Sequence, residues 1–286
     1  MPQTTQELID LLTLEEIEPG VYRGPHPNTP LQRLFGGQVL AQSLTAAQLS
    51  APDDRLVHSL NAYFLRPGRV DIPMIFEVEN LRDGGSFSSR RVVARQDGAV
   101  IFTLSASFQI AEDGLDHHDR LPGDVASPDD CPALVDVITS RFKRRLPIFA
   151  EWDALDVRWA DDSTRHGSMT AESHGAHMRV WVRTTSELPD DPNIHQAVLA
   201  YLSDITLLGV STLPHRVTFL SPQMQAASID HAMWFHRSVR ADQWMLYDMV
   251  SPSASHARGF SSGRLFQDER LIASCAQEGL IRMLDR

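Results

Sequence analysis

Two stretches of the chain decide its fold: GGQVLAQSLTAAQL at residues 36–49 and NIHQAVLAYLSDITLLG at residues 193–209. In both stretches apolar residues recur at intervals of three and four, the period of one face of an α-helix. Each helical pattern runs into text rich in β-branched and aromatic residues, which is typical of strands. The sequence therefore predicts two copies of one plan, a helix followed by a sheet.

Four strand-like runs follow the first helix. They read LVHSLNAYFL, VDIPMIFEVENL, SFSSRRVVARQ and AVIFTLSASFQI, and the turns between them fall at Pro67–Gly68, Asp83–Gly85 and Asp97–Gly98. Pro, Gly and Asp at such points favour chain reversals. We therefore expect one helix followed by an antiparallel meander.

The second half of the chain repeats the first at nearly constant spacing. Val39–Ala41 recurs 159 residues later as Val198–Ala200. Three further pairs lie 171 to 173 residues apart: Tyr63–Arg66 with Trp234–Arg237, Phe87–Ser89 with Phe260–Ser262, and Gln96–Asp97 with Gln267–Asp268. Because similar pieces recur in the same order, a duplication explains the pattern better than chance.

A long helix with a strongly curved antiparallel sheet is the hotdog arrangement, an α+β fold in which the sheet wraps the helix. Two units in one chain can pair their sheets side by side, which covers an exposed edge of each. We expect a first unit at residues 1–112, a linker at residues 113–132, and a second unit at residues 133–286 that carries the active site. A length of 286 residues suits two such domains.

Composition excludes several classes of protein. The formal net charge of −11 argues against nucleic-acid binding, because neutralising phosphates requires a dense field of Lys and Arg. Cys131 and Cys275 form no CxxC spacing, so neither a disulfide framework nor a zinc site is suggested, and a reducing cytoplasm fits. No run approaches the ~20 apolar residues of a membrane span, and the N-terminal stretch lacks the features of a secretory signal.

One carboxylate stands out on the second helix. At ~100° per residue Asp204 falls on the flank of the apolar stripe, beside Tyr201 and Leu208. A surface Asp at the margin of a buried face would look the same. A comparison of the two halves argues against that interpretation.

Three polar residues of the second half align with residues of the first half that are less able to take part in acid–base chemistry or hydrogen bonding. The repeat aligns Asp204 with Thr45, Ser228 with Val57, and Gln277 with Ala106. If both halves were only scaffolding, there would be no reason for this asymmetry to fall on one helix and the strands that pack around it. The sequence therefore predicts one site, in the second unit.

The motifs resemble the acyl-CoA thioesterase II family, of the bacterial TesB type, in the right order over nearly the whole chain. They are FGGQVLAQ, HSLNAYFLRPG, LRDGGSFSSRRV, AYLSDITLL, SIDHAMWFHR, SHARGFSSGRLF and ASCAQEG. The resemblance implies that Asp204, Ser228 and Gln277 hold and activate a hydrolytic water. Ser228 stands where Thr is the commoner residue, which keeps the hydroxyl and loses the methyl that fixes its rotamer.

The resemblance implies hydrolysis of acyl-CoA to a fatty acid and CoA without a cofactor, by an enzyme that assembles into a homo-oligomer, a dimer or tetramer. Asp204 would be the general base. The acyl tail would lie along Tyr201, Leu208 and Trp234. The oxyanion would sit at a helix N-terminus, for which Gly36–Gly37 is one candidate.

Two other motifs suggest different chemistry. Gly259–Gly263 matches the G-x-S-x-G nucleophile elbow, but it lies between strand patterns and no His follows Ser261, so we expect a structural bend. Asp190–His195 echoes a hydratase motif, yet Pro192 and Asn193 are also an ordinary helix start. A hotdog enoyl-CoA hydratase and a non-catalytic acyl-CoA-binding protein therefore remain as alternatives.

The remaining charged groups give weaker signals. The histidines have no HExxH or Cys partner, so no metal site is expected. Lys143–Arg145 is a weak candidate for contact with CoA phosphates and is otherwise a solvated helix end.

Overall fold

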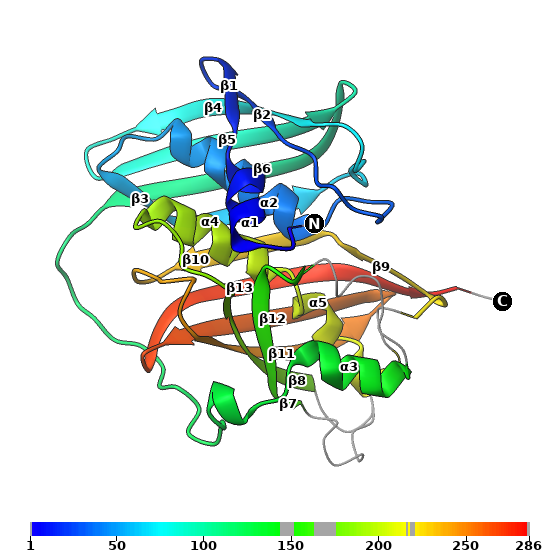
Figure 1. Ribbon diagram of the computed structural model, residues 1–286. Helices are drawn as coiled ribbons and strands as arrows, with labels where there is room; N and C mark the ends of the chain where they lie inside the picture. Colours follow the sequence, from blue (N-terminus) through cyan, green and yellow to red (C-terminus); the bar gives the residue numbers. More distant parts are fainter. Residues whose placement is uncertain (1, 144–151, 163–175, 216, 218–220, 285–286) are drawn as a thin grey trace.

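The computed structural model describes residues 2–143, 152–162, 176–215, 217 and 221–284. Two long helices occupy the centre, α2 (Gly36–Leu49) and α4 (Pro192–Ser203). The first fills its predicted range, whereas the second pattern, residues 193–209, is interrupted after Ser203 and resumes as the short helix α5 (Leu207–Val210). In Figure 1 the first unit, blue to teal, lies above the second, green to red, and both helices lie between their sheets. The layers are therefore sheet, helix pair, sheet.

The first unit adds a short N-terminal layer to the predicted helix and strands. Its elements are α1 (Thr5–Leu12), β1 (Glu15–Glu18), β2 (Val21–Gly24), α2, β3 (Arg55–Phe64), β4 (Met74–Asp83), β5 (Phe87–Gln96) and β6 (Ala99–Ile110). The helix α1 is amphipathic and buries Leu8, Leu11 and Leu12.

The expected meander is only partly correct. Strands β4, β5 and β6 pair in succession, but β3 lies beyond β6 and pairs with it. The connection through Pro67–Gly68 is long enough to cross from one side of the sheet to the other. This crossing leaves β3 on the edge that the second unit covers.

The second unit repeats this plan with additional short elements. It contains η1 (Pro128–Asp130), α3 (Leu134–Phe142), β7 (Leu155–Asp162), β8 (Ala176–Thr184), α4, α5 (Leu207–Val210), η3 (Leu213–His215), β9 (Met224–Ser228), β10 (Asp230–Phe235), β11 (Met245–Ser255), β12 (Arg258–Gln267) and β13 (Arg270–Met283). Residues 111–127 form neither helix nor strand. The boundaries of the two units stay a prediction.

One sheet runs through both units. In the described residues its order is β1-β2-β4-β5-β6-β3-β10-β13-β12-β11-β8-β7, with β9 pairing β13 outside this path. The junction is the antiparallel pair of β3 and β10, with Leu60 opposite Met233. The predicted double hotdog is confirmed, and its central edges are covered by each other.

The duplication extends to individual hydrogen bonds. Gln96 Nε2 donates to the carbonyl oxygen of Arg69 over 2.9 Å, and Gln267 Nε2 donates to that of Arg240 over 2.8 Å. Both pairs keep the spacing of 171 residues. The same side chain therefore fastens the same loop in each unit.

The helices α2 and α4 pack against each other in opposite directions. Gln48 Nε2 near the end of α2 donates to the carbonyl oxygen of Asn193 at the start of α4, over 3.2 Å. At the other end a Cβ on Gly37 would lie 2.3 Å from the carbonyl oxygen of Tyr201. Glycine at position 37 therefore allows the start of α2 to touch the end of α4.

The expectation that no run approaches a membrane span is wrong by length and composition alone, because one helical run among the described residues, Pro192–His215, is long and apolar enough to cross a membrane. Its most apolar window is 83% buried inside the protein. The two wrapped sheets and the neighbouring helix α2 account for its apolar character.

We predict that Gly37→Ala destabilises the fold. Helix propensity alone would favour Ala by about 1 kcal/mol. The steric overlap with the Tyr201 carbonyl instead predicts a net loss of about 1–3 kcal/mol, which thermal unfolding would measure as a lower Tm. Gly85→Ala is the matched control, because a Cβ there has no neighbour within 4 Å. Equal melting temperatures for the two variants would contradict the close helix contact.

Candidate active site

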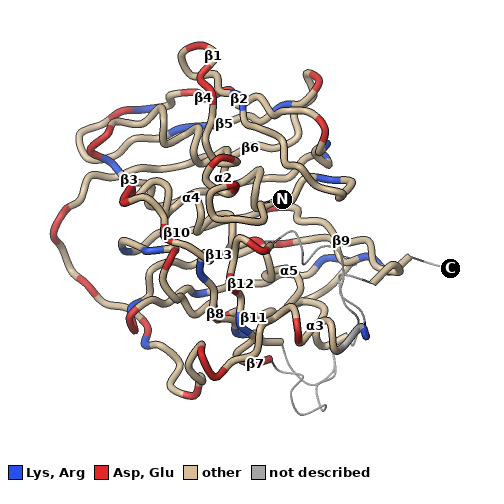
Figure 2. The backbone as a smooth tube through the Cα atoms, viewed as in Figure 1, with Lys and Arg blue, Asp and Glu red and all other residues tan. Residues whose placement is uncertain are grey.

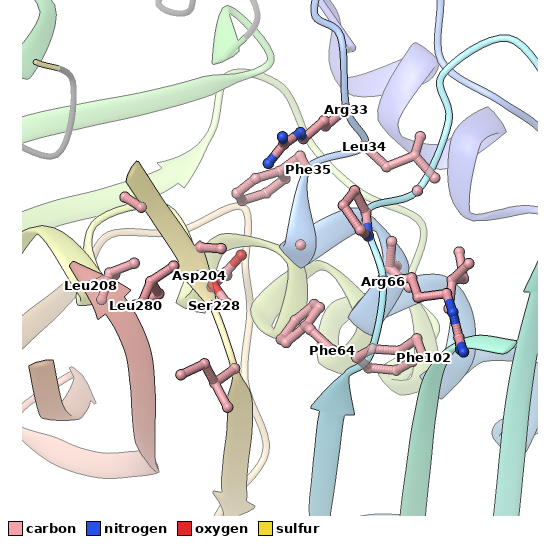
Figure 3. Close-up of a pocket in the computed structure, with 18 of the residues that line it drawn as sticks. Arg33, Leu34, Phe35, Phe64, Arg66, Phe102, Asp204, Leu208, Ser228 and Leu280 are labelled. Atoms are coloured by element: carbon pink, nitrogen blue, oxygen red, sulfur yellow. The ribbon is translucent and has the colours of Figure 1, made fainter. Parts of the chain in front are cut away.

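A cavity of about 540 Å³ lies at the junction of the two units. Its first wall comes from the loop before α2 and the ends of β3 and β6, including Leu34, Phe64 and Phe102. Its second wall comes from the end of α4, α5 and the strands β9 and β13. Figure 3 shows the two walls facing each other with Asp204 and Ser228 between them. The site therefore draws on both units, although its carboxylate comes from the second.

Asp204 is the C-cap residue of α4, where the chain turns toward α5. Its side chain is 8% exposed and borders the cavity. Its Oδ1 atom accepts a hydrogen bond from Ser228 Oγ over 3.2 Å and another from Gln277 Nε2. The three residues singled out from the sequence thus meet in one cluster.

The cluster is a closed ring of hydrogen bonds. Gln277 Nε2 also donates to Ser228 Oγ over 2.9 Å. Because the amide has two hydrogens, it can serve both partners and leave the Ser228 hydroxyl hydrogen for Asp204. Gln277 is 1% exposed and does not line the cavity. It therefore contacts the carboxylate and the hydroxyl from behind.

The glycines before α2 make room for the carboxylate. A Cβ on Gly36 would lie 2.6 Å from Asp204 Oδ2, so only glycine leaves this oxygen its place beside the cavity. Gly37 gives Asp204 a backbone hydrogen bond. Asp204 thus acts as an N-terminal cap for α2, whose own preceding residue, Phe35, provides no side-chain cap.

Burial raises the pKa of Asp204 to about 6, while hydrogen bonds from Gln277, Ser228 and the Gly37 backbone act to lower it. The two helix ends have opposite effects. The N-terminus of α2 favours the carboxylate, and the C-terminus of α4 disfavours it. The result is a carboxyl group that changes protonation near neutral pH.

A second set of buried groups fixes the last turn of α4. Tyr247 Oη donates to the carbonyl oxygen of Ser203 over 2.8 Å, and Ser203 Oγ lies 3.0 Å from His231 Nε2. Burial lowers the pKa of His231 to about 4, which keeps its ring neutral at pH 7. Burial raises the pKa of Cys275, beside Tyr247, to about 12. These groups hold the backbone next to Asp204 without adding charge.

The counterparts of the cluster in the first unit form no such site. Thr45 Oγ1 donates to the carbonyl of Ala41 in its own helix, over 3.1 Å. Val57 and Ala106 are buried apolar residues. The polar cluster therefore exists once among the described residues.

The G-x-S-x-G sequence forms no nucleophile elbow. Gly259–Gly263 lies within β12, where Ser261 is buried opposite Gln277 of β13. No strand-to-helix turn is present there. The rejection of a nucleophile elbow is correct, but the expected bend is wrong, because the segment is a regular strand.

The hydratase-like motif is a helix start. Asp191 accepts a hydrogen bond from the Asn193 backbone over 2.9 Å, and Pro192 is the first residue of α4. His195 Nδ1 accepts from the Ala241 backbone over 3.0 Å, and His195 does not line the cavity that holds Asp204. This His therefore has a structural partner and no path to that cavity.

Of the three residues expected along the acyl tail, only Leu208 lines the cavity. Tyr201 is buried in the core beneath it, and Trp234 is exposed on β10. Neither therefore lines the cavity, because periodicity predicts the face of a helix or strand on which a residue lies and does not predict which cavity that face borders.

The weak candidate for contact with CoA phosphates was Lys143–Arg145. Lys143 is exposed at the end of α3, while Arg144 and Arg145 lie outside the described residues. In the described ranges no group of three or more His, Cys, Asp or Glu could hold a metal ion.

The sequence interpretation missed the basic residues of the cavity. Arg33 and Arg66 both line it, from the loop before α2 and the end of β3. Their signal was available, because Arg33 lies two residues before the quoted motif FGGQVLAQ and Arg66 lies within HSLNAYFLRPG. Two wrapped helices, one continuous sheet and a buried carboxylate at the unit junction define a double-hotdog protein with one candidate site among the described residues.

Comparison with known proteins agrees with this class. The family described as acyl-CoA thioesterase matches residues 155–280, and the one described as acyl-CoA thioesterase N-terminal domain matches residues 25–109. The chain is 38% identical over 290 residues to acyl-CoA thioesterase 2 of Haemophilus influenzae, with 99% of both chains covered. It is 38% identical to human acyl-coenzyme A thioesterase 8, over 96% of this chain and 88% of that protein.

A solved structure shows the same relation. The acyl-CoA thioesterase II TesB2 from Mycobacterium marinum superimposes with a TM-score of 0.80 at 41% identity, covering 96% of this chain and 97% of that one. The chain therefore belongs to the acyl-CoA thioesterase II family, a family of thioester hydrolases.

We predict that Asp204→Asn raises the stability of the protein at neutral pH. Because the pKa of Asp204 is raised on folding, the folded state binds this proton more tightly than the unfolded chain does. The resulting stabilisation is complete below about pH 4 and is lost between pH 4 and about 6, where the unfolded chain ionises first. Asn keeps an oxygen for Ser228 and Gln277 and never ionises. We expect a gain on the order of 2 kcal/mol at pH 7.5 and almost none at pH 4, measured by thermal unfolding. Identical melting temperatures of the wild type and the variant at pH 7.5 would show that burying the ionised carboxylate of Asp204 does not destabilise the protein.

Proposed function

We propose that this protein hydrolyses acyl-CoA to a fatty acid and CoA by a water that Asp204 activates. One observation supports this most directly. Asp204 has one oxygen, Oδ1, fixed by Ser228 and Gln277, and its second oxygen, Oδ2, beside Gly36 at the wall of an apolar cavity. A carboxylate held on one side and available on the other suits a general base.

In the proposed reaction the water attacks the thioester carbonyl and gives a proton to Asp204 Oδ2. The tetrahedral intermediate then breaks its C–S bond, and the CoA sulfur takes the proton from Asp204. The products are the carboxylic acid and CoA thiol, so no covalent acyl-enzyme forms. The carboxylate is regenerated once the proton leaves.

The first turn of α2 is suited to the oxyanion. Gly36 lines the cavity, and its N–H makes no hydrogen bond within the described residues. Gly37 already serves Asp204. We assign the oxyanion to the Gly36 N–H, where the positive end of the helix dipole favours negative charge.

Ser228 and Gln277 have different roles in this proposal. Ser228 lines the cavity and can contact the water as well as Asp204. Gln277 is a positioning residue, because it touches only Asp204 and Ser228 from behind the cavity wall. The acyl chain lies along the apolar side of the cavity, against Leu208.

The pH dependence of turnover tests the base. Asp204 must be ionised to accept a proton, so kcat/KM falls about tenfold per pH unit below about 6 and is level above it. Thiol release from a series of acyl-CoA chain lengths would be followed with a thiol-reactive dye. Asp204→Asn should lose at least 100-fold in kcat at pH 7.5, where Asp204 of the wild type is ionised. Full turnover in that variant would rule out Asp204 as the base.

Gln277→Ala should act through Asp204 rather than on the substrate. Removing the amide takes away a hydrogen bond that lowers the pKa of Asp204, so we expect the acidic limb of the kcat/KM profile to move to higher pH. KM should change less than kcat. A profile with an unchanged midpoint would assign Gln277 a purely structural role.

The two alternatives are separated by the same assays. A hydratase would change the absorbance of an enoyl-CoA without releasing thiol, and a binding protein would form a stable complex with acyl-CoA and release no thiol.

We also propose a cytoplasmic location, consistent with the free Cys131 and Cys275, and assembly into a homo-oligomer.

A further inference from the structure

We propose that Arg33 and Arg66 of the first unit bind the phosphate groups of CoA, while the second unit supplies the base. This inference rests on the proposed function and names the substrate subsite that it requires. CoA carries its negative charge on a pyrophosphate and a ribose phosphate, far from the thioester. A protein with a net charge of −11 needs a local concentration of positive charge to bind it.

The charges on the cavity wall have the required sign. Among the described residues, Arg33 and Arg66 are the only cationic ones that line the cavity, and Asp204 is the only acidic one. Asp204 is buried, whereas both arginines are exposed. The solvent-facing part of the described cavity wall is therefore positive in an otherwise acidic protein, in which Figure 2 shows basic and acidic positions interspersed along the backbone.

The two arginines lack the acidic partners that most arginines of the first unit have. Ion pairs with Asp or Glu are formed by Arg23, Arg55, Arg69, Arg90, Arg91 and Arg95. Arg33 makes no hydrogen bond or ion pair within the described part of the chain, and the side chain of Arg66 donates only to the carbonyl of Val100, over 2.6 Å. Most of their N–H donors remain available for phosphate oxygens.

The duplication provides an internal comparison for Arg66. Its counterpart is Arg237, which donates in the same way to the carbonyl of Leu271, over 2.7 Å. Arg237 in addition forms an ion pair with Asp116. The charge of this position is thus neutralised in the second unit and left unpaired in the first, on the cavity wall.

Both arginines lie close in the sequence to residues that contact the carboxylate side of the cavity. Arg33 lies three residues before Gly36, and Arg66 lies two residues after Phe64, whose ring is next to Gly36. The Arg66 backbone N–H donates to the carbonyl of Ile101 over 3.1 Å. Figure 3 shows Asp204 and Ser228 between this side of the cavity and the apolar residues Leu208 and Leu280. A thioester at Asp204 would therefore direct CoA toward the arginines and its acyl chain toward Leu208.

The test compares two substrates with the same acyl group, acyl-CoA and acyl-pantetheine, which lacks the phosphates. The double variant Arg33→Gln/Arg66→Gln should raise KM for acyl-CoA by roughly tenfold or more, because two charge-assisted contacts are lost. The ratio of kcat/KM for acyl-CoA to that for acyl-pantetheine should fall by a similar factor. Added salt should weaken acyl-CoA binding by the wild type more than by the variant.

Arg82→Gln is the matched control. Arg82 is an exposed arginine of the same unit without an acidic partner in the described residues, and it lies away from the cavity. Arg82→Gln removes one positive charge, as each of the two cavity substitutions does, and should leave the substrate ratio at the wild-type value. A double variant that keeps the wild-type ratio, or that loses activity equally with both substrates, would overturn the proposal.

Calorimetry separates this proposal from the proposed function. Free CoA and pantetheine would be titrated into the inactive Asp204→Asn protein with and without the arginine substitutions. Weaker binding of CoA alone in the substituted protein supports the phosphate subsite even if wild type releases no thiol. Equal CoA affinity in the two proteins overturns the subsite even if hydrolysis is established.

Discussion

The structure depends on the close approach of two antiparallel helices, α2 and α4, at Gly37. Only glycine allows the first turn of α2 to rest on the Tyr201 carbonyl. This contact brings the C-cap of α4, Asp204, to the N-terminus of α2. The wrapped sheets exclude water from the helix pair, and the same packing that forms the core thereby creates a carboxylate at the end of a helix dipole.

A duplicated fold supplies two such helix junctions, and the two have diverged. One keeps Asp204 with its two hydrogen-bonding partners, and the other has Thr45 bonded to its own helix. The residues that differ lie at the same places in each unit, so the scaffold is preserved while the polar cluster is found at one junction. The cavity there combines a carboxylate from one unit with a wall from the other.

The buried carboxylate illustrates the conflict between stability and function. Desolvation opposes the charged form of Asp204, and the hydrogen bonds of Gln277 and Ser228 only partly offset it. The pKa of Asp204 is therefore about 6, close to neutral pH. A group with such a pKa can both accept and release a proton under these conditions. Tyr247 and His231 hydrogen-bond to Ser203 in the last turn of α4 and so hold the backbone next to Asp204 in place.

The sequence by itself determined the two helices, the duplication, the family, and the three residues of the cluster. Periodicity and repetition are local properties of the chain, and the comparison of the two halves made Asp204 stand out. Only the tertiary structure decided that β3 lies beyond β6, that Gln277 sits behind the cavity, and that Tyr201 and Trp234 do not line it. It also decided that Arg66 is unpaired while Arg237 is not. These facts depend on which distant segments meet across the sheet and the helix pair, and periodicity carries no information about those partners.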